Sequence, residues 1–328
     1  MQGQRSIVQI YICLAFFIFG LVAPTVLKAA DVIIGVSNQK KVDYGVGRAV
    51  CRAITKAIQG ISCESRRIAQ GDAPGPLAVL SDIGNGAIEL GIVPSDWVFQ
   101  AFTGSGAAKF FDTKYDNLRV LFTLQDEPIN LVLRRDSGIE SVDDLAGKRV
   151  NIANPGSYER AMMEMIMAAK GWDRGDFSIA EELSVSEQAL ALCYDRIQAM
   201  IISGSHPDSK VAKTLRVCDS KLVNIGGTEI SKLIADNPYL YEMDIGRDIY
   251  ADQKSVKTFG LRVLAVSSED IDKDLAGSIV RAVVDNSSIL SRLHPVLRTV
   301  SPGSLMGEEN VIPYHDGALE YFRSKGLM

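Results

Sequence analysis

The segment RVNIANPGSYERAMMEMIMAAKGW (149–172) joins a short strand to a helix through a tight turn. Alternating apolar residues at 150–152 indicate the strand, and Met and Ile then recur at helical spacing. Between them NPGS (154–157) turns the chain, with Asn154 or Ser157 placed to cap the helix. Such a turn exposes main-chain N–H groups and the positive end of the helix dipole, so it predicts an anion site. Turns of this kind also occur in α/β proteins that bind nothing there.

Strand and helix patterns alternate along most of the chain. The first region predicts strands at 31–37, 63–68 and 88–93, separated by helices. This order is typical of a largely parallel sheet. Two consecutive strands, 118–124 and 130–134, lead into a second alternating region, and a strand-like run at 258–266 leads back. The pattern therefore predicts an α/β protein with two lobes joined by crossing strands. Ligands of such sheets bind where the carboxyl ends of the strands meet, in the cleft between the lobes.

The expected division of the chain follows from the two crossings. Residues 31–125 plus 262–328 form lobe I, and residues 126–261 form lobe II. Residues 1–30 precede the fold. They contain Arg5, an apolar run at 7–23 and small residues after Pro24, which together predict a cleavable signal peptide and a periplasmic protein. An uncleaved membrane anchor is the alternative, since the apolar run approaches the length of a membrane span.

The charge of the chain limits its partners. A formal net charge of −5 and the absence of a basic run argue against nucleic acid and against an anionic membrane surface. A pocket with local donors remains compatible with a small anion. No cofactor and no metal are expected: the sequence GVGRAV (45–50) lacks the third glycine of a dinucleotide fingerprint, and there is no CxxC pair.

Four cysteines remain after signal cleavage, and an even number in an oxidising compartment suggests two disulfides. They are Cys51, Cys63, Cys193 and Cys218. Three pairings are possible. The expected bridges are Cys51–Cys63, from a helix to the next strand, and Cys193–Cys218. Four buried thiols are the alternative.

Several motifs resemble one known family in order along the chain. They are ELGIVPSDW (89–97), LAGKRVNI (145–152), NPGS (154–157), SHPD (205–208) and VIPYHDGA (311–318). Together they resemble the solute receptors of TRAP transporters in the TAXI class. The resemblance implies a type II periplasmic-binding-protein fold, no enzyme activity, a monomer, and delivery of the ligand to TRAP membrane permease subunits. Relatives bind small carboxylates such as glutamate or 2-oxoglutarate, so a small carboxylate or amino acid is the expected ligand. Two lobe I loops depart from the family pattern: the loop at 38–44 is longer and charged, and in the loop at 72–76 two prolines remove backbone donors.

The candidate ligand-binding residues come from both lobes. They are Ser37, Asn38, Tyr44, Pro74, Gly75, Asp96, Trp97, Asn154, Pro155, Gly156, Ser157, Tyr158 and His206. The Gly156 and Ser157 N–H groups, with the Ser157 hydroxyl, are expected to hold a ligand carboxylate.

Several of these residues have a second interpretation. Tyr158 faces the cleft or covers the loop, and Tyr44 and Trp97 are cleft walls or core aromatics. Asp96 accepts a hydrogen bond from a ligand amine or caps a helix. His206 contacts ligand or is a structural histidine.

Two other classes of protein compete with a transport receptor. An enzyme is disfavoured because no GxSxG elbow, HExxH or Walker loop is present. A ligand-sensing module that feeds a signalling receptor would bind in the same way and is the alternative. Hinge closure around the ligand is the expected mechanism.

Overall fold

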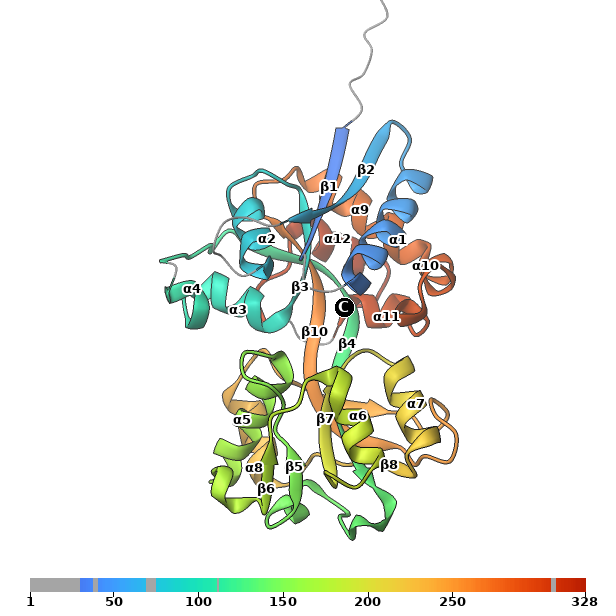
Figure 1. Ribbon diagram of the computed structural model, residues 1–328. Coiled ribbons are helices and arrows are strands. Elements are labelled where there is room, and N and C mark those ends of the chain that lie inside the picture. The colour runs from blue at the N-terminus through green and yellow to red at the C-terminus, as the bar shows by residue number, and fades with distance from the viewer. Residues whose placement is uncertain (1–29, 38–40, 69–74, 111, 308–310) are drawn as a thin grey trace, which may run out of the picture.

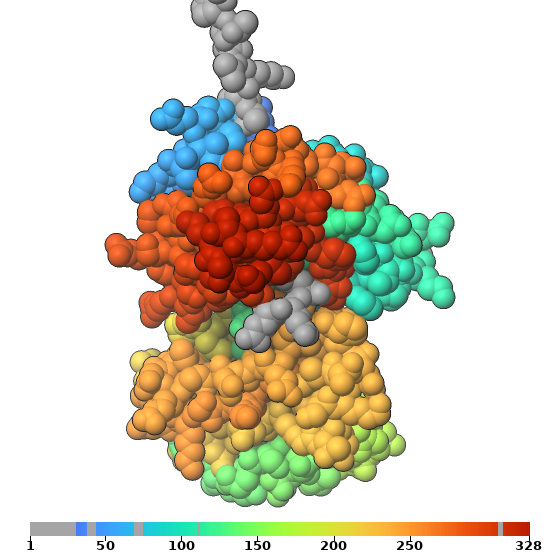
Figure 2. All heavy atoms as spheres, turned by 180° about the vertical axis from the view of Figure 1, so that it is seen from behind, coloured from blue at the N-terminus to red at the C-terminus, as the bar shows by residue number. Residues whose placement is uncertain are grey.

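The computed structural model describes residues 30–37, 41–68, 75–110, 112–307 and 311–328. Two α/β lobes lie one above the other, and two long strands, β4 (Leu118–Arg134) and β10 (Val256–Ser268), run through both (Figure 1). Figure 2 shows the same division from behind, with C-terminal residues covering lobe I above a narrower waist. The predicted two-lobed α/β architecture is confirmed.

The remaining elements fall on either side of this waist. Lobe I contains β1 (Ala30–Ser37), α1 (Lys41–Ala57), β2 (Ile61–Ile68), α2 (Gly75–Gly84), β3 (Leu90–Pro94), α3 (Ser95–Thr103), α4 (Gly106–Phe110), α9 (Lys273–Asp285), α10 (Ser287–Leu293), α11 (Pro302–Met306) and α12 (Asp316–Ser324). Lobe II contains β5 (Arg149–Asn151), α5 (Tyr158–Lys170), β6 (Ile179–Glu181), α6 (Val185–Cys193), β7 (Ala199–Ser203), α7 (Ser209–Val217), β8 (Ser220–Val223), α8 (Thr228–Asp236) and β9 (Tyr241–Ile245).

The strands form one continuous sheet that passes from lobe to lobe. Its order is β2-β1-β3-β10-β4-β7-β5-β6, with β8 also paired to β4 and β9 to β10. β1 is parallel to β2 and β3, and β5 is parallel to β6 and β7. β10 is antiparallel to β3, β4 and β9. Loops at the carboxyl ends of β1 and β3 in lobe I therefore face those of β5 and β7 in lobe II.

Each lobe buries both faces of its part of the sheet. In lobe I, α1, α9, α10 and α12 pack on one face, and α2, α3 and α4 on the other. In lobe II, α5 and α8 cover one face, while α6 and α7 cover the other. Apolar burial of this kind stabilises each lobe as its own core. The exact division at 125/126 and 261/262 stays a prediction.

One strand prediction was wrong. Segments 118–124 and 130–134 are not two strands, because β4 runs without interruption through Gln125, Asp126, Glu127 and Pro128. Residues 125–128 pair with 260–263 of β10, so they stay extended although proline lacks an N–H. The strands approach so closely that a Cβ on Gly260 would lie 2.2 Å from the main-chain oxygen of Glu127. β9, α4 and α11 were not predicted.

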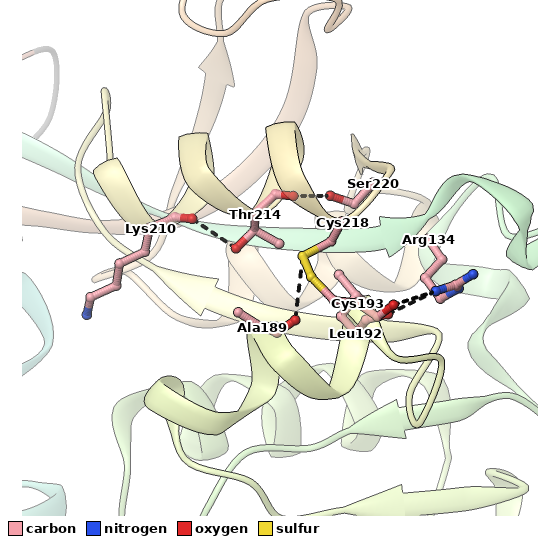
Figure 3. The surroundings of a disulfide bond; sticks show 8 residues. All are labelled: Arg134, Ala189, Leu192, Cys193, Lys210, Thr214, Cys218 and Ser220. Atoms are coloured by element: carbon pink, nitrogen blue, oxygen red, sulfur yellow. Dashed lines mark hydrogen bonds between the residues drawn. A yellow bond between two sulfur atoms is a disulfide. The ribbon is translucent and has the colours of Figure 1, made fainter.

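Both predicted disulfides are present. Cys51 of α1 is bonded to Cys63 of β2, and Cys193 at the end of α6 is bonded to Cys218 after α7. Around the second bridge, the Arg134 guanidinium donates to the main-chain oxygens of Leu192 and Cys193 (Figure 3). The bridge therefore ties α6 and α7 together next to the end of β4.

Candidate ligand-binding cleft

The predicted anion loop lies between β5 and α5. Ala153 and Gly156 have φ values of 65° and 79°, which reverse the chain. Ser157 is the N-cap of α5: its hydroxyl accepts from the Arg160 N–H at 3.1 Å and donates to the Asn154 oxygen at 2.8 Å. The Ser157 N–H also donates to the Asn154 oxygen, at 3.2 Å. Both Ser157 donors are thus engaged within the loop, whereas Pro155 and Gly156 are exposed at its tip.

The start of α3 in lobe I contacts lobe II. The N-cap of this helix is Pro94, with no side-chain hydrogen bond, so the interpretation of Asp96 as the helix cap is wrong. The Ser95 hydroxyl instead donates to the main-chain oxygen of Tyr239 in lobe II at 2.8 Å, and accepts from the Arg262 N–H at 3.2 Å. The rings of Phe99 and Tyr239 lie 5.6 Å apart. The lobes therefore touch at this end of the cleft.

Tyr158 connects the two walls electrostatically. Burial raises the pKa of its hydroxyl well above the ordinary value, and the carboxylates of Asp96, Glu127 and Glu159 raise it further. These three acids come from lobe I, the crossing strand β4 and lobe II. Glu159 also accepts from the Ser203 hydroxyl at 2.5 Å. Carboxylates from both lobes and from the crossing strand thus act on one buried phenol.

Arg262 supplies positive charge at the same junction, and it was missed from the sequence. Its guanidinium lies 4.1 Å from the centroid of the Tyr241 ring and 3.7 Å from an Asp126 oxygen. Although 57% of the Asp126 side chain is exposed, desolvation by its surroundings raises the pKa of that carboxyl, against the attraction of Arg262. A signal was present: arginine interrupts the apolar run of β10.

His206 lies in lobe II, in the turn that follows β7, and its peptide bond to Pro207 is cis. Its Nδ1 is 2.5 Å from the Tyr250 hydroxyl, and the two rings pack edge to face at 5.4 Å. Burial lowers the pKa of His206 to about 4, opposed by the Asp208 carboxylate, so the ring is neutral at pH 7. No described contact joins it to the loop at 154–158.

The other candidates lie in lobe I. The Arg67 guanidinium stacks on Tyr44 at 4.4 Å, and Tyr44 packs against the core under α1. Trp97 packs against the core under α2 and α3, so its described contacts are those of a core aromatic. Ser37 is buried at the end of β1, and Gly75 begins α2. Asn38 and Pro74 lie outside the described residues.

Within the described ranges, no group of three or more His, Cys, Asp or Glu is arranged to hold a metal ion. Over the same residues, no helix is both long and apolar enough to cross a membrane.

The two lobes, the crossing strands and the cleft between them define the fold of periplasmic solute-binding proteins. The profile of the NMT1-like family matches residues 34–326, and the chain belongs to this family. A TctC solute-binding protein from Polaromonas is 15% identical, with a TM-score of 0.55 over 92% of this chain and 98% of that one. A putative periplasmic sulfonate-binding protein, SsuA, from Methylobacillus flagellatus KT is 18% identical, with a TM-score of 0.50 over 92% and 88%. Both solved structures share the fold.

Proposed function

We propose that this chain is an extracytoplasmic solute-binding protein of the TAXI type, which captures a small carboxylate and delivers it to a TRAP-type membrane permease. The ligand lies between the loop at 154–158 and the start of α3. Its capture closes the lobes about β4 and β10. The proposal rests on the family, the two-lobed fold and the resemblance of the motifs, together with the signal peptide expected at residues 1–30.

The observation that carries the proposal is the meeting of charged groups from both lobes around Tyr158. Asp96 belongs to lobe I and Glu159 to lobe II, while Glu127 lies on the strand that connects them. A ligand that contacts all three elements binds the closed arrangement better than an open one. This differential affinity is what shifts a hinge equilibrium.

The signs of these charges favour an amino acid over a dicarboxylate. A second ligand carboxylate near Asp96, Glu127 and Glu159 would be repelled, whereas an ammonium group would be attracted. The ligand's single carboxylate is met by the exposed Gly156 N–H at the positive end of α5 and by Arg262. The Ser157 hydroxyl takes no part, since it caps the helix. An amino acid with one carboxylate and one ammonium group therefore fits this pattern better than glutamate or 2-oxoglutarate, each of which carries two carboxylates.

Calorimetric titration of the exported protein with amino acids and dicarboxylates tests this assignment. We expect one amino acid per chain to bind and to be recovered chemically unchanged. Asp96→Asn should weaken binding about tenfold or more, because a charge-assisted hydrogen bond contributes about 1.5–3 kcal/mol. Asp116→Asn is the matched control, since Asp116 is an exposed lobe I acid paired with Lys114. Tighter binding of a dicarboxylate than of any amino acid to the parent protein would contradict the assignment.

A further inference from the structure

A cavity of about 200 Å³ lies beside the crossing strands and is bordered by both lobes. Gln125 and Asp126 of β4 form one side, and Ser205 and His206 after β7 form another. Apolar side chains of lobe II and two lobe I residues, Val296 and Thr299, close the rest. A cavity of this volume has room for a small molecule in place of several waters.

Three polar atoms at this cavity have no hydrogen-bond partner among the described residues. They are Oε1 of Gln125, Oγ of Ser205 and Nε2 of His206. Gln125 and Ser205 are only 7% and 8% exposed, so bulk water does not satisfy them. Buried polar groups are nearly always paired, and leaving one unpaired is unfavourable. Three such atoms around one cavity indicate a missing partner molecule.

The hydrogen-bonding character of the cavity is mixed. Tyr250 accepts from the Asp208 N–H at 2.8 Å, and its own hydrogen has a closer acceptor in His206 Nδ1, at 2.5 Å, than in the Asp208 oxygen, at 3.4 Å. This arrangement leaves the proton of the neutral ring on Nε2, which donates toward a ligand. Gln125 Oε1 accepts, and the Ser205 hydroxyl does either. A complementary ligand therefore needs an acceptor and a donor close together.

The charge at the cavity disfavours ions. His206 is neutral, Gln125 and Ser205 carry no charge, and the Asp126 carboxylate has Arg262 at 3.7 Å. Asp244, the other acid at the cavity, is exposed to solvent. An anion would be repelled by the carboxylates of Asp126 and Asp244. A cation would compete with Arg262 for the Asp126 carboxylate.

We propose that this hinge cavity is a second binding site, which takes a small uncharged molecule with adjacent hydrogen-bond donor and acceptor groups. A 1,2-diol and a primary amide both have this chemistry. Because its walls belong to β4 and to both lobes, an occupant also contacts the elements that move when the cleft closes. The site goes beyond the proposed capture of an amino acid, and none of the residues that define it belongs to the loop at 154–158.

The test uses the imidazole nitrogen NMR signals, since the chain has three histidines, His206, His294 and His315. The full protein is titrated with 1,2-propanediol and acetamide, and with acetate and methylammonium as charged counterparts. We expect a saturable shift of the His206 signals alone with at least one uncharged probe, and weaker binding of both ions. The uncharged probe that binds more tightly shows whether the site takes a diol or an amide.

Two variants locate the binding. Gln125→Leu and Ser205→Ala should each weaken it about twofold to tenfold, the range for one neutral hydrogen bond. Ser205→Ala removes a single oxygen, so it decides the matter should Gln125→Leu fail to fold. Gly156→Asn, in the amino-acid loop, should leave binding of the uncharged probes unchanged. The proposal is overturned by the lack of a saturable His206 shift, by tighter binding of an ion, or by loss of binding in Gly156→Asn alone.

Discussion

The Ser95 hydroxyl of lobe I donates a hydrogen bond of 2.8 Å to the main-chain oxygen of Tyr239 in lobe II. The same oxygen atom of Ser95 accepts from the Arg262 N–H on β10, at 3.2 Å. Ser95 is fully buried, so both bonds are shielded from water. One side chain thus joins the start of α3, the crossing strand and lobe II.

Ser95→Ala should shift the protein toward an open form. Loss of one neutral hydrogen bond between the lobes removes about 0.5–1.5 kcal/mol from the closed state. We expect a larger radius of gyration in small-angle X-ray scattering without ligand, and up to about tenfold weaker amino-acid binding. Thr103→Val is the matched control, because the Thr103 hydroxyl bonds only within α3 and to Ser105. Equal scattering curves for Ser95→Ala and the parent would show that this contact does not hold the lobes.

His206 should make folding stability depend on pH. Its pKa is about 4 when folded and about 6.5 when unfolded, so the unfolded chain takes up the proton first. This stability is fully present above pH 6.5, and up to about 3 kcal/mol of it is lost as the pH falls to 4. Tyr250 and Asp208 are the titratable groups that face the ring.

Urea denaturation between pH 7 and pH 4.5 measures this loss. The free energy of unfolding should fall less with decreasing pH in His206→Gln than in the parent, whereas His294→Gln should retain most of the decline. An unchanged decline in His206→Gln would assign the pH dependence to other groups.

Removing a disulfide should destabilise the fold, and slightly more for the bridge that closes the longer loop. The separations are 12 residues for Cys51–Cys63 and 25 for Cys193–Cys218. Chain entropy then gives about 3 kcal/mol for the first bridge and about 3.5 kcal/mol for the second. Paired Cys→Ala variants compared by denaturant unfolding check the two values. Free-thiol titration of the unfolded parent, without reductant, should find neither pair reduced, and reactive thiols there would contradict the pairing.

Gly260→Ala should disrupt the crossing strands. The added Cβ would lie 2.2 Å from the Glu127 oxygen, and a backbone atom cannot move away as a flexible side chain would. We expect a loss of about 2–3 kcal/mol or more in the free energy of unfolding, as for overpacked cores. Gly303→Ala in α11 is the control, since its Cβ meets nothing within 4 Å. Similar melting temperatures for both variants would show that the crossing tolerates a side chain.

Local patterns predicted the local parts of this structure. Strand alternation, the Ser157 cap and the pairing of cysteines on neighbouring elements all follow from residues near each other in sequence. The junction between the lobes does not. β4 appeared as two strands because Pro128 looks like a break, yet pairing with β10 keeps it extended. β9 (Tyr241–Ile245) is short and exists through its pairing with β10.

The site shows the same limit. Arg262, Glu127 and Ser95 are far apart in sequence, and only the crossing of β4 and β10 brings them together. The hinge cavity likewise joins Gln125 to His206 through the fold. The sequence left His206 as a ligand contact or a structural histidine, and its described hydrogen-bond partner is Tyr250. Whether the residues predicted at 154–158 bind ligand stays a prediction.

Native mass spectrometry of the exported protein tests the central claim most directly. The account predicts one bound amino acid per chain, released on denaturation and retained less by Asp96→Asn than by Asp116→Asn. A parent protein that carries no small molecule, and that gains none when incubated with a mixture of amino acids and small carboxylates, would contradict it.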